Sequence, residues 1–171
     1  MTPVCVAAPA TPVVPLDELK AHLNVDFSDD DALIVAYEGA AVAHLDAWTG
    51  ILGRCINEQT WRISLDNAGC VRSPFPDVVS IEVSDESGAP MSDFVTGIDG
   101  LGTYVDVAGE GPFRIDFTCA MSDGMRPVIV MAIKLLVAHW YMNREAVVAS
   151  GQASAPLAFE ALINPVRWWS L

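Results

Sequence analysis

Apolar side chains at helical spacing predict a short helix near the start of the chain. Leu16, Leu19 and Leu23 lie three or four residues apart and follow Pro15, a residue suited to the first position of a helix. We therefore expect a helix over residues 15–24. The preceding residues, 1–14, combine prolines with small side chains, so a flexible or extended arm is expected there.

A second, longer helix is expected over residues 28–50. Ser28 is suited to the N-cap, and the acidic run 29–31 then places negative charge at the positive end of the helix dipole. The same run could hold a metal ion, but a helix cap explains it more economically. Gly50 and Gly53 are expected to end the helix. Its apolar face comprises Leu33, Tyr37, Ala40, Ala41, His44, Leu45 and Trp48.

Between residues 57 and 119 the apolar period changes from about 3.6 residues to about 2, which indicates strands. Turn-forming segments, for example Asp99-Gly100, separate the alternating stretches. We expect a small antiparallel sheet with one buried face. Its alternating apolar positions are Trp61, Ile63, Leu65, Val79, Ile81, Val83, Phe113, Ile115 and Phe117.

The helical period returns after Pro127, which predicts a third helix over residues 127–147. Small residues over 150–156 indicate a linker. Residues 157–163 are expected to form one or two helical turns, stopped by Asn164-Pro165. Residues 150–171 are thus predicted to be a linker and a C-terminal segment.

These elements predict an α+β fold in a single domain over residues 15–149. Two N-terminal helices and a long C-terminal helix form a small helical bundle. A small antiparallel β-sheet, residues 57–119, is inserted between them, and a C-terminal tail follows.

Composition and charge exclude several classes of protein. Apolar residues make up 52% of the 171 residues, enough for an ordinary core. The net charge of −13 opposes binding to a phosphate backbone, so sequence-specific nucleic-acid binding is not expected. Solubility alone would also explain that charge. The apolar run Val128 to Met142 is shorter than the roughly 20 residues of a membrane-spanning helix. Residues 1–15 contain no Lys or Arg, so the basic region of a signal peptide is not expected there.

No pattern of catalytic, cofactor-binding or metal-binding residues is present in the sequence. Phosphate-binding loops, dinucleotide fingerprints, nucleophile elbows and zinc-protease motifs are absent. His22, His44 and His139 lie on predicted helices in apolar company, and the four cysteines have no metal-ligand spacing, so reduced thiols are expected. We expect no enzyme, cofactor or metal. The alternatives are a small-molecule-binding module or a hydrolase built from scattered carboxylates.

The C-terminal tail carries two neighbouring tryptophans, Trp168 and Trp169. Tryptophan is enriched at binding hot spots, so the tail could dock on a partner. The alternative is that the tail folds back and one ring caps the domain's own core. The residues alone do not separate the two.

Several segments in this order resemble the head–tail connector (adaptor) family of long-tailed phages and phage-like gene transfer agents. They cover most of residues 14–167. The most specific of these segments is the helix around His139 together with the residues 143–145 that follow it. The segments are VPLDELKAHL at 14–23, DDDALI at 29–34, HL at 44–45, WTG at 48–50, QTW at 59–61, PVI at 127–129, LLVAHWYMNREAV at 135–147 and LINPVR at 162–167.

The resemblance implies a structural virion protein, assembled in the host cytoplasm, that lies in the neck between head and tail. Neighbouring copies would form a ring of about twelve beneath the portal. The portal protein would contact one side, and a stopper or tail-completion protein the other. Genomic DNA would pass through without sequence-specific binding, and no membrane is involved.

The resemblance also implies that the C-terminal segment reaches the portal. The residues expected to dock there are Leu162, Ile163, Pro165, Arg167, Trp168 and Trp169. The chain departs from the family in its longer Pro/Ala arm and its terminal tryptophan pair. Its central sheet over residues 66–119 matches only in general character.

Overall fold

The computed structural model describes residues 1–143 and 157–168. These fall into two compact units. Of the described residues, the helical unit comprises 11–52, 122–143 and 157–167, and the β unit comprises 1–10, 53–121 and 168. The expected mixture of helices and antiparallel strands is confirmed, while the expectation of a single unit is replaced by two.

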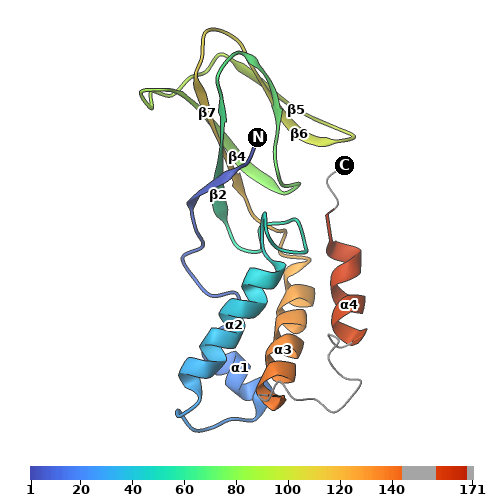
Figure 1. Cartoon of the computed structure of the whole chain (residues 1–171). Coiled ribbons are helices and arrows are strands. Elements are labelled where there is room, and N and C mark those ends of the chain that lie inside the picture. The colour runs from blue at the N-terminus through green and yellow to red at the C-terminus, as the bar shows by residue number, and fades with distance from the viewer. Residues whose placement is uncertain (144–156, 169–171) are drawn as a thin grey trace. The chain divides into compact units, whose positions relative to one another are not determined.

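The helical unit contains α1 (Leu16–Leu23), α2 (Asp31–Leu45), α3 (Arg126–Met142), α4 (Leu157–Ile163) and the 3-10 helix η1 (Asn164–Val166). Helix α3 contacts α1, α2 and α4, as Figure 1 shows. The apolar side chains that these helices bury between them include Leu19, Ile34, Ala41, Leu45, Ile129, Ile133, Val137 and Phe159. Part of the helix predicted over 127–147 lies outside the described residues.

Helix α2 is shorter at both ends than the predicted 28–50. Ser28 is not the N-cap: its carbonyl accepts a bond from the Asp31 N–H at 3.1 Å, and Asp30 precedes the helix. At the other end, Asp46 is extended and Ala47 has a φ of +56°. The last carbonyls are capped instead by the N–H groups of Ile51 and Leu52. The turn before Gly50 therefore ends the helix.

The buried face of α2 also contains a carboxylate, which the sequence pattern did not indicate. Glu38 is 7% exposed, and its Oε1 accepts hydrogen bonds from the N–H groups of Val13 and Val14 at 3.0 and 3.2 Å. A buried carboxylate needs such donors to offset its desolvation. Glu38 thereby holds the segment before α1 against α2.

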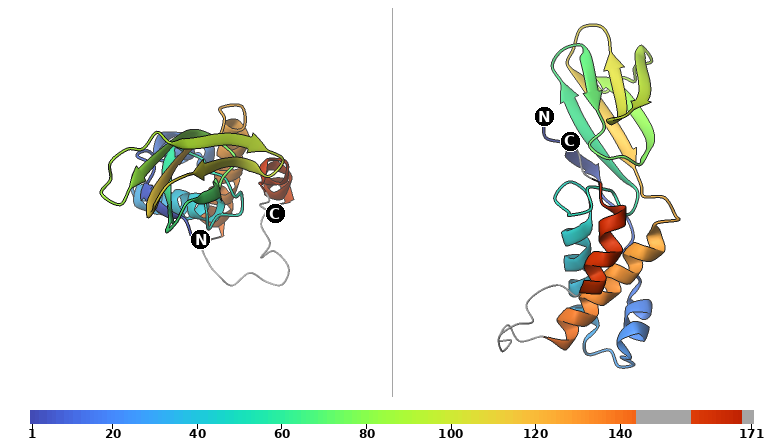
Figure 2. Two further views of the ribbon diagram at one scale, coloured as in Figure 1. Left: turned by 90° about the horizontal axis from the view of Figure 1, so that it is seen from above. Right: turned by 90° about the vertical axis from the view of Figure 1, so that its right-hand side faces the viewer.

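The β unit contains two antiparallel sheets. The first has the strand order β1-β2-β7-β4, and the second β3-β6-β5. Figure 2 shows the twist of these strands from two further directions. Their bounds are β1 Val4–Ala7, β2 Gln59–Leu65, β3 Gly69–Arg72, β4 Val78–Asp85, β5 Phe94–Asp99, β6 Gly102–Val107 and β7 Phe113–Cys119.

Alternation of apolar residues determines the buried face of the first sheet. On the central strand β7, Phe113, Ile115 and Phe117 are buried, and the intervening residues point to the other face. Partners directly opposite each other in register share a face, so Ile63 of β2 and Val83 of β4 join Ile115 in the core. The strands predicted from period-2 alternation are confirmed.

Two expectations concern the N-terminal arm and the inserted sheet. The arm over residues 1–14, expected to be flexible or extended, is extended over β1, which pairs antiparallel with β2, matching Val4 with Arg62. The expectation of one inserted sheet is wrong: among the described residues, β3, β5 and β6 pair with one another and form a second sheet. Within the described parts of the chain, no helix is long and apolar enough to cross a membrane.

Candidate partner-binding surfaces

The C-terminal residues of the helical unit pack on one side and are exposed on the other. Phe159 and Ile163 of α4 are buried where α4 packs on α3, and the Phe159 ring stacks on His44, with 6.3 Å between centroids. Leu157, on the outer side of α4, is 85% exposed. The helix therefore offers a partner only its outer face.

Arg167 fixes the end of this segment within the helical unit. Its backbone N–H donates to the Ile163 carbonyl at 3.1 Å, and its Nε donates to the Ile51 carbonyl at 2.9 Å. Because Ile51 follows α2, these bonds connect the chain after η1 to the turn that ends α2. Sequence spacing gave no sign of this contact, which joins residues 116 positions apart.

Trp168 belongs to the β unit and lies against the residues at the start of Gly53–Met121. The Arg54 guanidinium lies over the indole ring, 5.9 Å from its centroid, and also forms an ion pair with Asp77 at 2.5 Å. Gly53 has a φ of +62°, and a Cβ there would lie 2.7 Å from the Trp168 carbonyl oxygen. Glycine thus permits the close approach of the two backbones.

The residues expected to dock on a partner differ in how available they are. Ile163 is 2% exposed in the chain's own core, Leu162 and Arg167 are half-buried, and Pro165 is exposed. Trp168 is half-buried, and its ring lies against Arg54 of the same chain. Trp169 lies outside the described residues.

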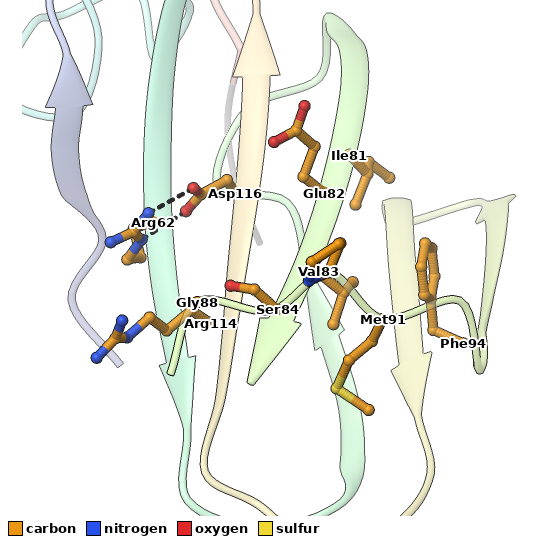
Figure 3. Close-up of a pocket in the computed structure, with 11 residues that line it drawn as sticks. Arg62, Ile81, Glu82, Val83, Ser84, Gly88, Met91, Phe94, Arg114 and Asp116 are labelled. Atoms are coloured by element: carbon orange, nitrogen blue, oxygen red, sulfur yellow. Dashed lines mark hydrogen bonds and ion pairs between the residues drawn. The ribbon is translucent and has the colours of Figure 1, made fainter. Parts of the chain in front are cut away.

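A second surface lies on the solvent side of the first sheet, beneath the loop between β4 and β5. Arg62 and Asp116 occupy neighbouring strands and form a two-pronged ion pair with distances of 2.7 and 2.6 Å (Figure 3). The hydrogen bond to Asp116 raises the pKa of Arg62. The pair forms part of the lining of a cavity of about 510 Å³, with Met91 and Phe94 on its apolar side.

Arg114, another residue of this cavity, is the one arginine or lysine in the described parts of the chain for which no ion pair or hydrogen bond is found. Glu82 lines the same cavity from the adjacent strand. This arrangement offers one guanidinium and one carboxylate beside apolar side chains. The lining of this cavity includes no histidine and no cysteine.

Other reactive side chains of the described residues lie outside this cavity. The acidic run at the start of α2 takes part in structural contacts: Asp30 accepts a bond from the Tyr141 hydroxyl at 2.5 Å, and Asp31 pairs with Lys20 at 2.6 Å. All four cysteines lie in the described residues, and none is in a disulfide. A hydrogen bond with Cys55 lowers the pKa of buried Cys119. Among residues 1–143 and 157–168, no three His, Cys, Asp or Glu side chains form a metal-binding group.

Comparison with known proteins finds similarity in structure. No protein-family model and no curated protein matches the sequence. A chain from the neck of an empty gene transfer agent (GTA) particle, computed with C6 symmetry, is similar with a TM-score of 0.71 and 20% identity. A chain from the neck of a native GTA particle, computed with C12 symmetry, has a TM-score of 0.69 and 20% identity. A chain from the virion of a native gene transfer agent particle is similar with a TM-score of 0.68 and 21% identity.

Each of these alignments covers 100% of this chain and 97% of the other. The likeness therefore includes both the helical unit and the β unit, from the first strand to the C-terminal helix. At this level of identity, what the chains share is the fold.

Proposed function

We propose that this chain is a structural subunit of the neck of a phage-like particle or gene transfer agent, where it connects head and tail. The observation that carries the proposal is the fold shared over the whole chain with proteins of GTA necks. The order of sequence segments between residues 14 and 167, which does not depend on the structure, supports the same family.

The proposed role is an assembled ring and not catalysis. The C6 and C12 symmetries of the similar neck structures support a ring of copies about the particle axis. In such a ring each copy uses two different surfaces, one toward each neighbour. A net charge of −13 suits a subunit past which DNA moves without being bound, because like charges repel.

The C-terminal segment, residues 157–171, is proposed to dock on the portal protein. Two residues of its described part are well placed for this: Leu157 on the outer face of α4, and Pro165, which is exposed on η1. Ile163 is buried and holds the segment against the rest of the helical unit. The opposite side of the ring would then receive a stopper or tail-completion protein.

Electron microscopy of the full chain mixed with its portal tests both parts of this proposal. A collar of density on the portal is expected with the wild type and is expected to be lost in Leu157→Asp. Val35→Asp is the matched control, because Val35 is also an exposed apolar residue of a helix in the same unit, at 52% exposed. A collar retained by Leu157→Asp would contradict C-terminal docking, and no collar with the wild type would contradict the connector role.

A further inference from the structure

On one strand of the β unit, β5, the face that is buried on the neighbouring strand is open among the described residues. Antiparallel register places Phe94, Thr96 and Ile98 of β5 opposite Val107, Val105 and Thr103 of β6, so all six share one face of the second sheet. On β6 this face is buried, with Val105 0% and Val107 2% exposed. On β5 it is open, and Ile98 is 82% exposed. An isoleucine in that position is typical of a surface that is covered in an assembly.

A hollow of about 530 Å³ lies where this face is open, between β5 and residues 78–81 of β4. Apolar side chains line it from both strands, among them Val79 at 59% exposed and Ile98. None of the residues that line the hollow has an ionisable side chain. In a chain with 22 acidic residues, such a neutral surface is distinctive.

The two strands beside the hollow are both edge strands. β4 ends the order of the first sheet, and β5 ends the order of the second. The far half of β4 is partly covered, because the Val83 carbonyl accepts the Met91 N–H at 2.8 Å and the Asp85 N–H donates to the Ala89 carbonyl at 3.0 Å. No strand in the described residues pairs with the outer edge of β5. An exposed apolar strand edge of this kind readily pairs with another chain.

The chain itself contains a segment that fits this edge. β1 is the other edge strand of the first sheet, and its Val4 is 60% exposed. The first fifteen residues carry no charged side chain, so β1 can approach the neutral hollow without like-charge repulsion. Within one copy, β2 and β7 separate β1 from β4. A contact between β1 and the hollow would therefore have to be made between two copies.

We propose that β1 of one copy pairs along the open edge of β5 in the next copy and covers Ile98. The proposal rests on the ring assembly proposed above and identifies one contact between its subunits. It uses a different surface on each copy, as a closed ring requires. Main-chain hydrogen bonds would provide affinity, and the neutral hollow would provide selectivity for an uncharged strand.

Site-directed cross-linking of the full chain tests this pairing. Val4→Cys is combined with Thr96→Cys in a protein that also carries Cys5→Ala and Cys70→Ala, and a short bismaleimide is added. The control pair replaces Thr96→Cys with Ala68→Cys, an exposed position next to β3, at the opposite edge of the second sheet. Both pairs are assayed in concentrated solution and in particles assembled with the variant.

The β1–β5 pair is expected to give roughly tenfold more linked multimers than the control pair, because paired strands hold the thiols at high effective concentration. Ile98→Asp, with its native cysteines, should weaken self-association by at least about tenfold. Its melting temperature should remain unchanged, because this side chain is exposed in the single copy.

The outcomes separate this pairing from the connector role. If the chain is incorporated into particles but the two cysteine pairs cross-link equally, the β1–β5 pairing is wrong and the connector role still holds. If the chain is absent from the particles, the connector role is wrong. In that case the cross-linking yields of the two pairs in concentrated solution test the β1–β5 pairing by themselves. Self-association unaffected by Ile98→Asp also counts against the pairing.

Discussion

Glu38 shows how a single buried charge can organise the start of a fold. Its carboxylate accepts bonds from two consecutive backbone N–H groups, those of Val13 and Val14, which are themselves buried. Sequence periodicity cannot predict this role, because a glutamate on a helix is ordinarily solvated. The donors come from a segment 24 and 25 residues away, and only the folded chain brings them to the carboxylate.

Substitution of Glu38 should therefore destabilise the helical unit. Glu38→Ala leaves two buried N–H groups without an acceptor and is expected to lower the free energy of unfolding by about 2–3 kcal/mol. Glu38→Gln keeps one acceptor oxygen and should cost about 1 kcal/mol. Urea denaturation measures both. Glu160→Gln, at an exposed position of α4, is the control, and an equal effect there would contradict the structural role of Glu38.

Asp99 provides a prediction about pH. The hydrogen bond from Arg72 is the main cause that lowers the pKa of Asp99, and the Leu101 N–H adds to it. A lowered carboxyl pKa means that the stabilising contact is present above the ordinary pKa and is lost as the pH falls through the folded-state pKa. NMR titration should show the Asp99 pKa rising toward its ordinary value in Arg72→Gln. An Asp99 pKa that is the same in Arg72→Gln as in the wild type would contradict the contact between Arg72 and Asp99.

At the scale of elements, strongly periodic segments were predictable and weakly periodic ones were not. The helix over residues 157–163 and the strands around Ile63, Val83 and Ile115 agree with the sequence pattern. β1 was missed because Val4–Ala7 stands among prolines and exposes all four of its residues. β5 was missed because Gly97 interrupts it, where the Tyr104 ring occupies the place of a side chain.

The pairing of β1 with β2 leads to a prediction about the N-terminus. Hydrogen exchange should find the amides of the β1–β2 ladder protected, and deletion of residues 1–8 should cost about 2 kcal/mol, the loss of a few backbone hydrogen bonds at about 1 kcal/mol each. Amides that exchange at the rate of an unfolded chain would instead support the flexible arm expected from composition. The exchange of β7 amides, in the centre of the sheet, provides the internal reference.

At the scale of the whole molecule, the net charge opposes the approach of one copy to another. Each copy carries −13, so copies repel one another at long range. Salt screens that repulsion, while a neutral contact such as the one between β1 and β5 is not weakened by it. Self-association measured by light scattering should therefore strengthen between about 0.05 M and about 0.5 M salt. Weaker association at high salt would mean that ion pairs hold the copies together.

The sequence indicates a family resemblance more clearly than it indicates which surfaces the chain buries. Segments such as those at residues 14–23 and 135–147 resemble a known family in the same order, and that resemblance is visible without a structure. The fate of the C-terminal residues was not visible: Ile163 and Trp168 pack within the chain because of partners far away in the sequence, α3 and Arg54. Which surface remains for another subunit follows only from the fold.

The connector role is tested most directly by cryo-electron microscopy of particles from the host that carries this gene, with mass spectrometry of the same particles. The account predicts that copies of this fold surround the axis at the junction of head and tail, with α4 toward the portal. Particles whose heads and tails are joined in the absence of this chain would contradict it.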